Sequence, residues 1–198
     1  MSLTRSILGA VAVMAALAAP TAAQERAVSI FARSGGYNGL TDLDDAGTAD
    51  FKKVGFNVGG GVAVDLHRYV ALRGDFTFAR NELRAGGVET GSELDRYFYD
   101  AAVQLQYPTQ TGVMPYAFVG AGGVTLHEVG TEGENTTKPA ATLGVGLNYT
   151  IPRSGFGIFV EGKSWLFDAS DLNGALAAFD KAQYELAWTG GLSYRFPY

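Results

Sequence analysis

The sequence predicts an all-β protein, an eight-stranded antiparallel up-and-down β-barrel that crosses a membrane. Three observations predict this fold. Eight stretches alternate apolar and polar residues with a period of two, which is typical of strands that separate two different media. The connections between these stretches alternate long and short. Beyond the N-terminal segment, no apolar run approaches the ~20 residues that a membrane-spanning helix needs.

The last stretch, residues 182–198, shows the alternation most clearly. Its apolar face consists of Ala182, Tyr184, Leu186, Trp188, Gly190, Leu192, Tyr194, Phe196 and Tyr198. The residues between them are polar or small, with Glu185 and Arg195 among them. The stretch is longer than an average strand of roughly 5–6 residues. The aromatic residues at both ends of its apolar face fit a bilayer that is bounded by aromatic girdles.

Composition narrows the class of protein. The 198-residue chain has a formal charge of −5, no cysteine and 27 glycines, and its phenylalanines and tyrosines together number 22. A chain of this length forms one or two domains. The lack of cysteine excludes a disulfide scaffold and a cysteine-ligated metal site. The mild acidity argues against a nucleic-acid partner, which calls for a basic face.

The first 23 residues have the features of a secretory signal peptide. Arg5 supplies the basic start, a short apolar run follows, and Pro20 ends this run before a group of small residues. We therefore expect residues 1–23 to be removed and residues 24–198 to form the mature barrel domain. Without Arg5, the mature chain has 14 basic and 20 acidic residues, a charge of −6.

Each predicted strand is assigned by its apolar face. The strands span residues 27–37, 54–66, 70–79, 96–107, 115–126, 140–151, 156–167 and 182–198. The apolar sets of the first four are Val28, Ile30 and Ala32; Val54, Phe56, Val58, Val62, Val64 and Leu66; Val70, Leu72, Phe76 and Phe78; and Tyr97, Tyr99, Ala101, Val103, Leu105 and Tyr107. Phe98 is an exception, because it is an aromatic residue within the polar set of its strand.

The fifth predicted strand has two alternative facings. Its outward residues are either Ala117, Val119 and Ala121 or Phe118, Val124 and Leu126. The sixth and seventh strands are clearer. Their apolar sets are Leu143, Val145, Leu147, Tyr149 and Ile151 in the sixth, and Ile158, Val160 and Leu166 in the seventh.

The connections indicate how the barrel lies in the membrane. The four long, polar connections are residues 37–53, 80–95, 130–138 and 168–181, and the three short turns lie at 67–68, 108–113 and 152–155. Transmembrane barrels have long loops on the outer side and short turns on the periplasmic side. An even number of strands then places both chain ends on the periplasmic side.

The polar faces of the strands carry balanced charge. Their charged residues are Arg33, Arg73, Arg96, Lys163 and Arg195, against Asp65, Asp75, Asp100, Glu161 and Glu185. An eight-stranded barrel is just wide enough inside for side chains, and a buried charge without a partner costs several kcal/mol. We therefore predict that lipid surrounds the apolar faces and that these ten residues form a charge network in the lumen. Glycines on the same face leave room for long side chains, namely Gly59, Gly61, Gly144, Gly146 and Gly191. A soluble, lipocalin-like barrel is the alternative, and it would show smaller apolar outer faces and a larger cavity.

This inverted alternation, the signal peptide and the terminal ladder of alternating apolar residues resemble the small outer-membrane barrels of Gram-negative bacteria, the OmpA/OmpX-type and related opacity-protein-like porin family. The ladder consists of Leu192, Tyr194, Phe196 and Tyr198. Pro115-Tyr116, followed by Gly120, Gly122 and Gly123, is similar to the fifth strand of that family. The resemblance covers residues 24–198. It implies a location in the cell outer membrane and contact with outer-membrane lipids and lipopolysaccharide. It also implies that the ladder is a C-terminal assembly signal, which the barrel-assembly machinery reads. Family members usually end in phenylalanine, whereas this chain ends in tyrosine.

Other motifs point to no cofactor and no metal. Residues 59–61 and 120–123 are rich in glycine, but no helix follows either of them, as a nucleotide-binding loop requires. Residues 42–47 resemble a calcium-binding loop. However, Ala46 occupies a ligand position, and Lys53 stands where the closing glutamate belongs.

An enzymatic function would require a suitably placed histidine. Barrels that modify lipids need a nucleophile and a histidine near the outer interface. His67 falls in a predicted periplasmic turn, whereas His127 lies near the outer end of its strand, where Ser170 or Ser92 from the loops could approach it. We predict that the protein is not an enzyme.

Three functions remain in order of preference. The first is a structural or surface-interaction barrel that stabilises the outer membrane and presents four polar, acidic loops to extracellular ligands. The second is a narrow, porin-like channel for small solutes. The third is a lipid A-modifying enzyme.

Overall fold

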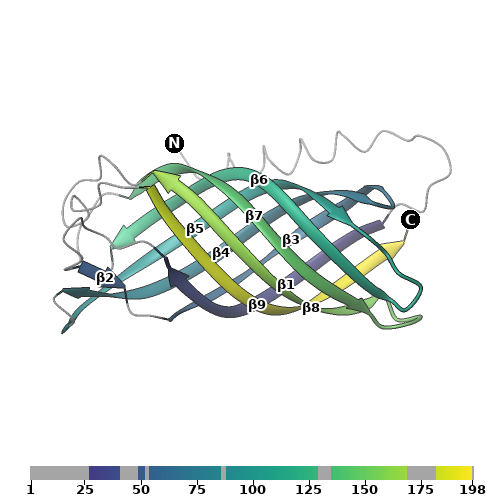
Figure 1. Ribbon diagram of the computed structural model, residues 1–198, viewed down its shortest axis with the longest axis horizontal. Coiled ribbons are helices and arrows are strands. Elements are labelled where there is room, and N and C mark those ends of the chain that lie inside the picture. The colour runs from purple at the N-terminus through teal and green to yellow at the C-terminus, as the bar shows by residue number, and fades with distance from the viewer. Residues whose placement is uncertain are drawn as a thin grey trace.

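The computed structural model describes residues 27–40, 49–51, 54–85, 88–128, 135–168 and 182–197. Eight strands form a closed antiparallel barrel (Figure 1), so the predicted fold is confirmed. The barrel strands are β1 (Ala27–Gly39), β3 (Gly55–His67), β4 (Val70–Ala85), β5 (Val88–Gln106), β6 (Val113–Glu128), β7 (Thr136–Thr150), β8 (Phe156–Asp168) and β9 (Ala182–Pro197). Within these ranges, no helix is both long and apolar enough to cross a membrane.

Pairing between the first and last strands closes the barrel. β1 pairs with β9 from Ala27↔Pro197 to Gly39↔Glu185, and pairing between β4 and β5 completes the ring. All barrel strands are inclined to the long axis (Figure 1). Closure leaves these strands without a free edge, which is a condition for crossing a bilayer with strands.

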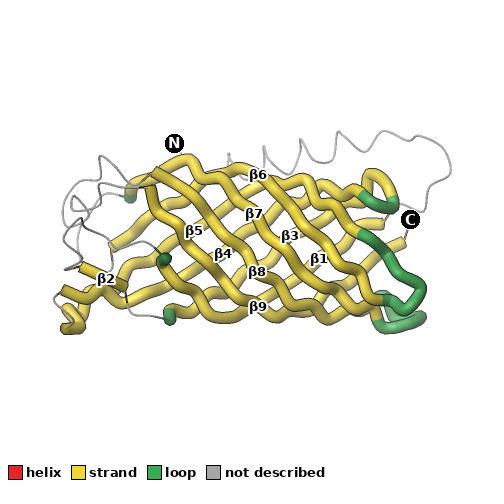
Figure 2. Tube along the Cα trace, in the orientation of Figure 1, coloured by secondary structure: helices red, strands yellow, loops and turns green. Residues whose placement is uncertain are grey.

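The three short turns lie together at one end of the barrel, and β9 also ends there (Figure 2). In two of these turns Gly112 and Gly155 adopt positive φ values of 82° and 74°, a conformation that costs glycine little. Arg153 has a positive φ of 64° in the same turn as Gly155. Because transmembrane barrels have their short turns on the periplasmic side, we assign this end to the side that the sequence predicts to be periplasmic.

The predicted connection at residues 80–95 is wrong in its extent. β4 continues to Ala85 and β5 begins at Val88, and these two residues pair with each other. A short strand, β2 (Ala49–Phe51), pairs with the extended end of β4 and lies within the predicted connection 37–53. Alternation does not predict these extensions, because a hairpin that projects into water needs no apolar face. Its strands therefore show no apolar–polar alternation.

The strand faces follow the predicted alternation. Outward residues such as Val119, Val145 and Leu192 are 66%, 62% and 64% exposed, as expected of side chains that meet lipid. The two facings left open for β6 are now resolved, because Phe118 and Val124 are buried in the lumen. Aromatic side chains occupy the outward surface near the short turns, namely Tyr69, Tyr107, Tyr149, Phe156 and Phe196.

Candidate functional site

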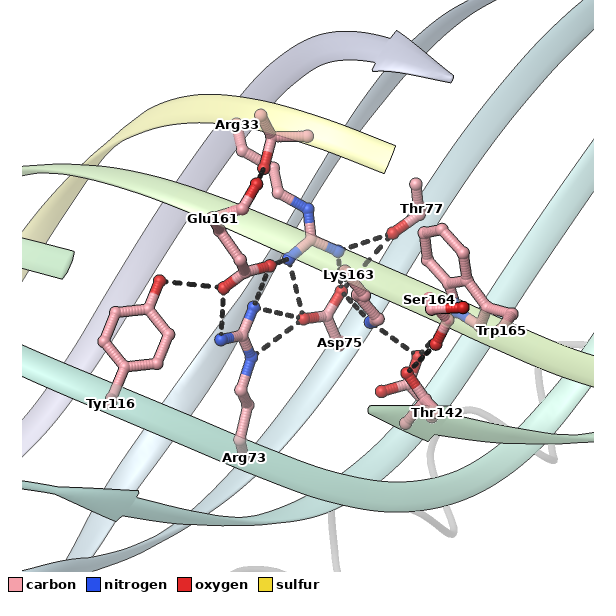
Figure 3. A network of polar contacts seen from close by, with 12 residues as sticks. Arg33, Arg73, Asp75, Thr77, Tyr116, Thr142, Glu161, Lys163, Ser164 and Trp165 are labelled. Atoms are coloured by element: carbon pink, nitrogen blue, oxygen red, sulfur yellow. Dashed lines mark hydrogen bonds and ion pairs between the residues drawn. The ribbon is translucent and has the colours of Figure 1, made fainter. Parts of the chain in front are cut away.

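The centre of the lumen holds a cluster of charged side chains, here called the ionic cluster (Figure 3). Its members are Arg33, Arg73, Lys163, Asp75, Asp100 and Glu161. Asp75 accepts hydrogen bonds from Arg33 and from Arg73, whose Nη2 lies 2.7 Å from Oδ2. The Nζ of Lys163 lies 3.3 Å from Asp75 Oδ1 and 2.8 Å from Asp100 Oδ2. Asp75 therefore joins three cations that come from three different strands.

Glu161 connects the other side of the ionic cluster. Its carboxylate lies 2.9 Å from Arg33 Nη1 and 2.6 Å from Arg73 Nη1. Arg73 Nη2 also donates to Glu161, at 3.1 Å, and the hydroxyl of Tyr116 donates a fourth hydrogen bond, at 2.9 Å. The ionic cluster thus contains three cations and three carboxylates, all almost completely buried at the side chain. This neutrality is what allows charges to remain in a narrow, poorly hydrated lumen.

Two further ion pairs lie along the barrel axis on either side of the ionic cluster, one toward the outer end and one toward the periplasmic end. Arg96 Nε lies 3.1 Å from Glu185 Oε1 on the outer side. Arg195 pairs with Asp65 on the periplasmic side, where Gln106 also donates to Asp65 at 3.0 Å. The structure therefore gathers the ten charges singled out in the sequence into three groups, each of them electrically neutral.

Aromatic rings support the cations of the ionic cluster. The guanidinium carbon of Arg73 lies 4.4 Å from the ring centres of both Phe31 and Phe118. Lys163 Nζ lies 5.7 Å from the Phe118 ring and 4.9 Å from that of Trp165. The sequence does not predict that Phe118 and Tyr116 join the network, because either face of their strand could point outward.

In the outer half of the lumen a cluster of apolar side chains, here called the outer plug, packs beside the buried pair of Arg96 and Glu185. Its large members are Tyr37, Leu94, Phe98, Val124, Leu126, Trp165 and Phe167. The rings of Phe98 and Trp165 stack with their centres 4.3 Å apart. None of the seven is more than 4% exposed. The exception noted in the sequence, Phe98, is thus a lumen residue, and the outer plug separates the ionic cluster from the outer loops.

The periplasmic half of the lumen contains a cavity of about 60 Å³. Polar residues around it include Asp65, Gln106, Asn148 and Ser193, and Arg73 lies at its inner end. A volume of this size can hold a few water molecules.

Four of the five lumen-face glycines singled out in the sequence lie against aromatic rings rather than charged side chains. A β-carbon at Gly144 would overlap the ring of Phe118, and one at Gly146 would overlap the ring of Tyr116. The prediction that the lumen glycines leave room for long charged side chains therefore needs a correction. Beside Gly144 and Gly146 the neighbours are aromatic residues of β6, and beside Gly61 and Gly191 they include the rings of Phe31 and Phe159, whereas a β-carbon at Gly59 would meet the backbone of β4.

The residues considered for catalysis or metal binding form no such site in the described part of the chain. His127 Nδ1 lies 2.7 Å from Oδ1 of Asn135, and His67 Nδ1 accepts a hydrogen bond from the backbone N–H of Tyr69. Ser170 and the side chain of Ser92 lie outside the described residues, as does the acidic loop at 42–47. No group of three or more histidine, aspartate or glutamate side chains could hold a metal ion within the described ranges.

The proposed assembly signal lies on the last strand. Leu192 and Phe196 are exposed on the outer surface, and Tyr194 stacks edge-to-face with Phe156 and Phe196. Tyr198 and the predicted signal peptide fall outside the described residues, so both assignments stay predictions.

Comparison with solved structures identifies other small barrels with the same fold. Neisserial surface protein A matches with a TM-score of 0.58 and 13% identity, over 89% of this chain and 100% of that one. Ail of Yersinia pestis, in complex with the heparin analogue sucrose octasulfate, matches with a TM-score of 0.51 and 17% identity, over 87% and 98%. The outer membrane protein OprG of Pseudomonas aeruginosa matches with a TM-score of 0.50 and 10% identity, over 87% of this chain and 96% of that one. At these identities the likeness concerns the fold.

Sequence comparison supplies the family. No curated protein sequence matches the chain. The family model described as the outer membrane protein beta-barrel domain matches residues 9–196, nearly the whole chain. The apolar outer faces, the closed ring of strands and this match agree with one another. The chain belongs to the outer membrane protein beta-barrel family, and its place is the outer membrane.

Proposed function

We propose that the protein is a closed structural barrel that stabilises the outer membrane and displays its outer loops for surface interactions, without catalysing a reaction. The observation that supports this function is the filling of the lumen. The outer plug and the ionic cluster lie one behind the other along the barrel, and their side chains are almost fully buried. A solute that enters from the periplasmic cavity would have to disrupt both to cross.

The outer connections supply the surface for such interactions. The segments 37–53, 80–95, 130–138 and 168–181, which comprise these connections and the outer ends of the adjoining strands, contain thirteen aspartates and glutamates but only six lysines and arginines. Ail was crystallised with a sulfated sugar, a polyanion. The acidic loops of this chain favour cationic partners, so we expect its surface interactions to differ in sign from that complex.

Planar-bilayer recording tests the closed lumen. Refolded protein is expected to give no steady single-channel current above the noise, whereas a large porin recorded in the same bilayer gives clear steps. Antibody detection or recovery of the protein from the membrane confirms insertion. Sustained, uniform conductance steps from the inserted protein would contradict the closed barrel.

A narrow channel is the second candidate. The observation that favours it is the cavity of about 60 Å³ that reaches Arg73 from the periplasmic side. The same recordings distinguish the two functions, because a channel requires a current and a closed barrel does not.

Deletion of Tyr198 tests the proposed C-terminal signal. We expect the shortened chain to reach the outer membrane at a reduced level, because the ladder of apolar residues loses its terminal aromatic side chain. Immunoblotting of outer-membrane fractions measures this level, and Tyr198→Phe serves as the control that retains an aromatic end. Equal levels of the deletion variant and the wild type would refute the signal.

A further inference from the structure

Two adjacent short turns form a defined surface at the periplasmic end of the barrel. One contains His67, Arg68 and Tyr69, and the other begins at Tyr107. The backbone N–H of Gln106 donates to the carbonyl of Tyr69 at 2.9 Å, so hydrogen bonding fixes the two turns side by side.

The side chains of these turns stack on one another. The rings of Tyr69 and Tyr107 lie 6.0 Å apart and are almost parallel, at 12°. The guanidinium carbon of Arg68 lies 4.6 Å from the centre of the Tyr69 ring, and the His67 ring lies 5.5 Å from it. A cation over an aromatic face is held by the ring quadrupole. The charge of Arg68 is therefore positioned by the protein rather than swinging freely in water.

No carboxylate of the described residues lies within ion-pair distance of Arg68, in contrast to the five cations of the lumen network. The short turns contain Arg68 and Arg153 but no aspartate or glutamate. The outer loops, by comparison, have an excess of acidic residues. Among the residues that the structure describes, the positive charge of Arg68 therefore lacks an anionic partner, and a group outside the protein can bind it.

The surroundings of Arg68 identify that group. Leu66 and Leu105, next to the two turns, are 44% and 61% exposed on the lipid-facing surface. Tyrosines in membrane proteins concentrate at the level of the lipid headgroups, and the exposed Tyr69 and Tyr107 lie at the end of the barrel where such a level is expected. The planar fork of an arginine matches the oxygens of a phosphate and forms strong, charge-assisted hydrogen bonds with them.

We propose that His67, Arg68, Tyr69 and Tyr107 form a binding site for the phosphate group of an anionic phospholipid in the periplasmic leaflet. Arg68 binds the phosphate, the two tyrosines border the headgroup, and Leu66 and Leu105 contact the acyl chains. This site is independent of whether the lumen conducts.

Native mass spectrometry with phosphatidylglycerol and phosphatidylethanolamine tests the site. We expect the wild-type protein in detergent to retain phosphatidylglycerol in preference to phosphatidylethanolamine. Arg68→Gln is expected to weaken this retention about tenfold, since it removes a charge-assisted contact. Arg153→Gln is the matched control, because it removes the same charge from another short turn for which no aromatic ring stacks on the arginine among the described residues. It is expected to retain lipid at nearly the wild-type level.

A second variant and a competition experiment complete the test. Tyr107→Leu keeps the charge and removes part of the aromatic surface, and we expect it to lose preference for phosphatidylglycerol while heat-modifiability on gels shows a folded barrel. Inorganic phosphate at millimolar concentration is expected to leave the bound lipid in place. Equal losses in the Arg68 and Arg153 variants, no preference in the wild type, an unchanged Tyr107→Leu variant, or displacement of lipid by free phosphate would each overturn the proposed lipid site.

Discussion

Replacing Asp75 by asparagine is expected to lower the free energy of unfolding by about 3–5 kcal/mol, the cost of leaving a buried charge without its partner. Asp75 interacts with Arg33, Arg73 and Lys163 inside the lumen. Asparagine has nearly the same shape, so the change leaves packing in place and gives the ionic cluster a net charge of +1. Urea unfolding of the refolded barrel in lipid vesicles measures the effect.

A second substitution distinguishes charge balance from the loss of a hydrogen bond. Combining Asp75→Asn with Arg33→Gln leaves the pair of Arg73 with Glu161 and the pair of Lys163 with Asp100 intact and restores neutrality. We expect this double variant to be more stable than Asp75→Asn alone. Arg153→Gln is the surface control: Arg153 is exposed in a short turn, and a surface substitution of this kind usually changes stability by no more than about 0.5 kcal/mol. If Asp75→Asn costs no more than this control, the ionic cluster does not need its charge balance.

Replacing Val145 by arginine is expected to destabilise the barrel by about 2–4 kcal/mol, the cost of a cation at the middle of the bilayer. Val145 is 62% exposed on β7, and its flanking residues on this strand, Gly144 and Gly146, face the lumen. The arginine must therefore reach toward a headgroup region or draw water into the membrane. The same unfolding experiment in vesicles gives the free energy.

The depth of the substituted residue provides the control. Val113 lies at the start of β6, next to a short turn, and also faces outward. Arginine there is expected to cost only about 0–1 kcal/mol, because the guanidinium reaches the interface. Leu192→Arg repeats the mid-membrane test on another strand. Neutral results for Val145→Arg and Leu192→Arg, or an equal cost for Val113→Arg, would contradict the lipid-facing assignment.

Most of the barrel could be predicted from alternation alone. A strand with lipid on one side and a polar lumen on the other has two different faces along its whole length, so the period of two marks its position and its orientation. Where this contrast disappears, prediction fails. The ends of β4 and β5 carry polar residues on both faces and were assigned to a connection. On β6 both faces are largely apolar, because Phe118, Val124 and Leu126 line the lumen, so its facing stayed open.

For the candidate site, too, the sequence predicts which face of a strand each residue occupies, but not which residues meet. Alternation placed Arg33, Asp75 and Glu161 on inward faces, but these residues are up to 128 positions apart in the sequence. Their contacts depend on the register of neighbouring strands and on the stagger with which the barrel closes. The outer plug was harder still to predict, because Phe98 and Trp165 resemble lipid-facing residues in every respect except their parity along the strand.

The sequence by itself determined the strand count, the antiparallel barrel, the lipid-facing surface and the balance of charge inside, since these properties follow from local periodicity and composition. Only the tertiary structure decided which carboxylate meets which cation, that aromatic and aliphatic side chains pack around one ion pair in the outer half of the lumen, and that the turns at Arg68 and Tyr107 lie together. The physical reason is that alternation fixes the side of the sheet on which a residue lies, whereas its height in the barrel depends on cross-strand registers that no single strand encodes.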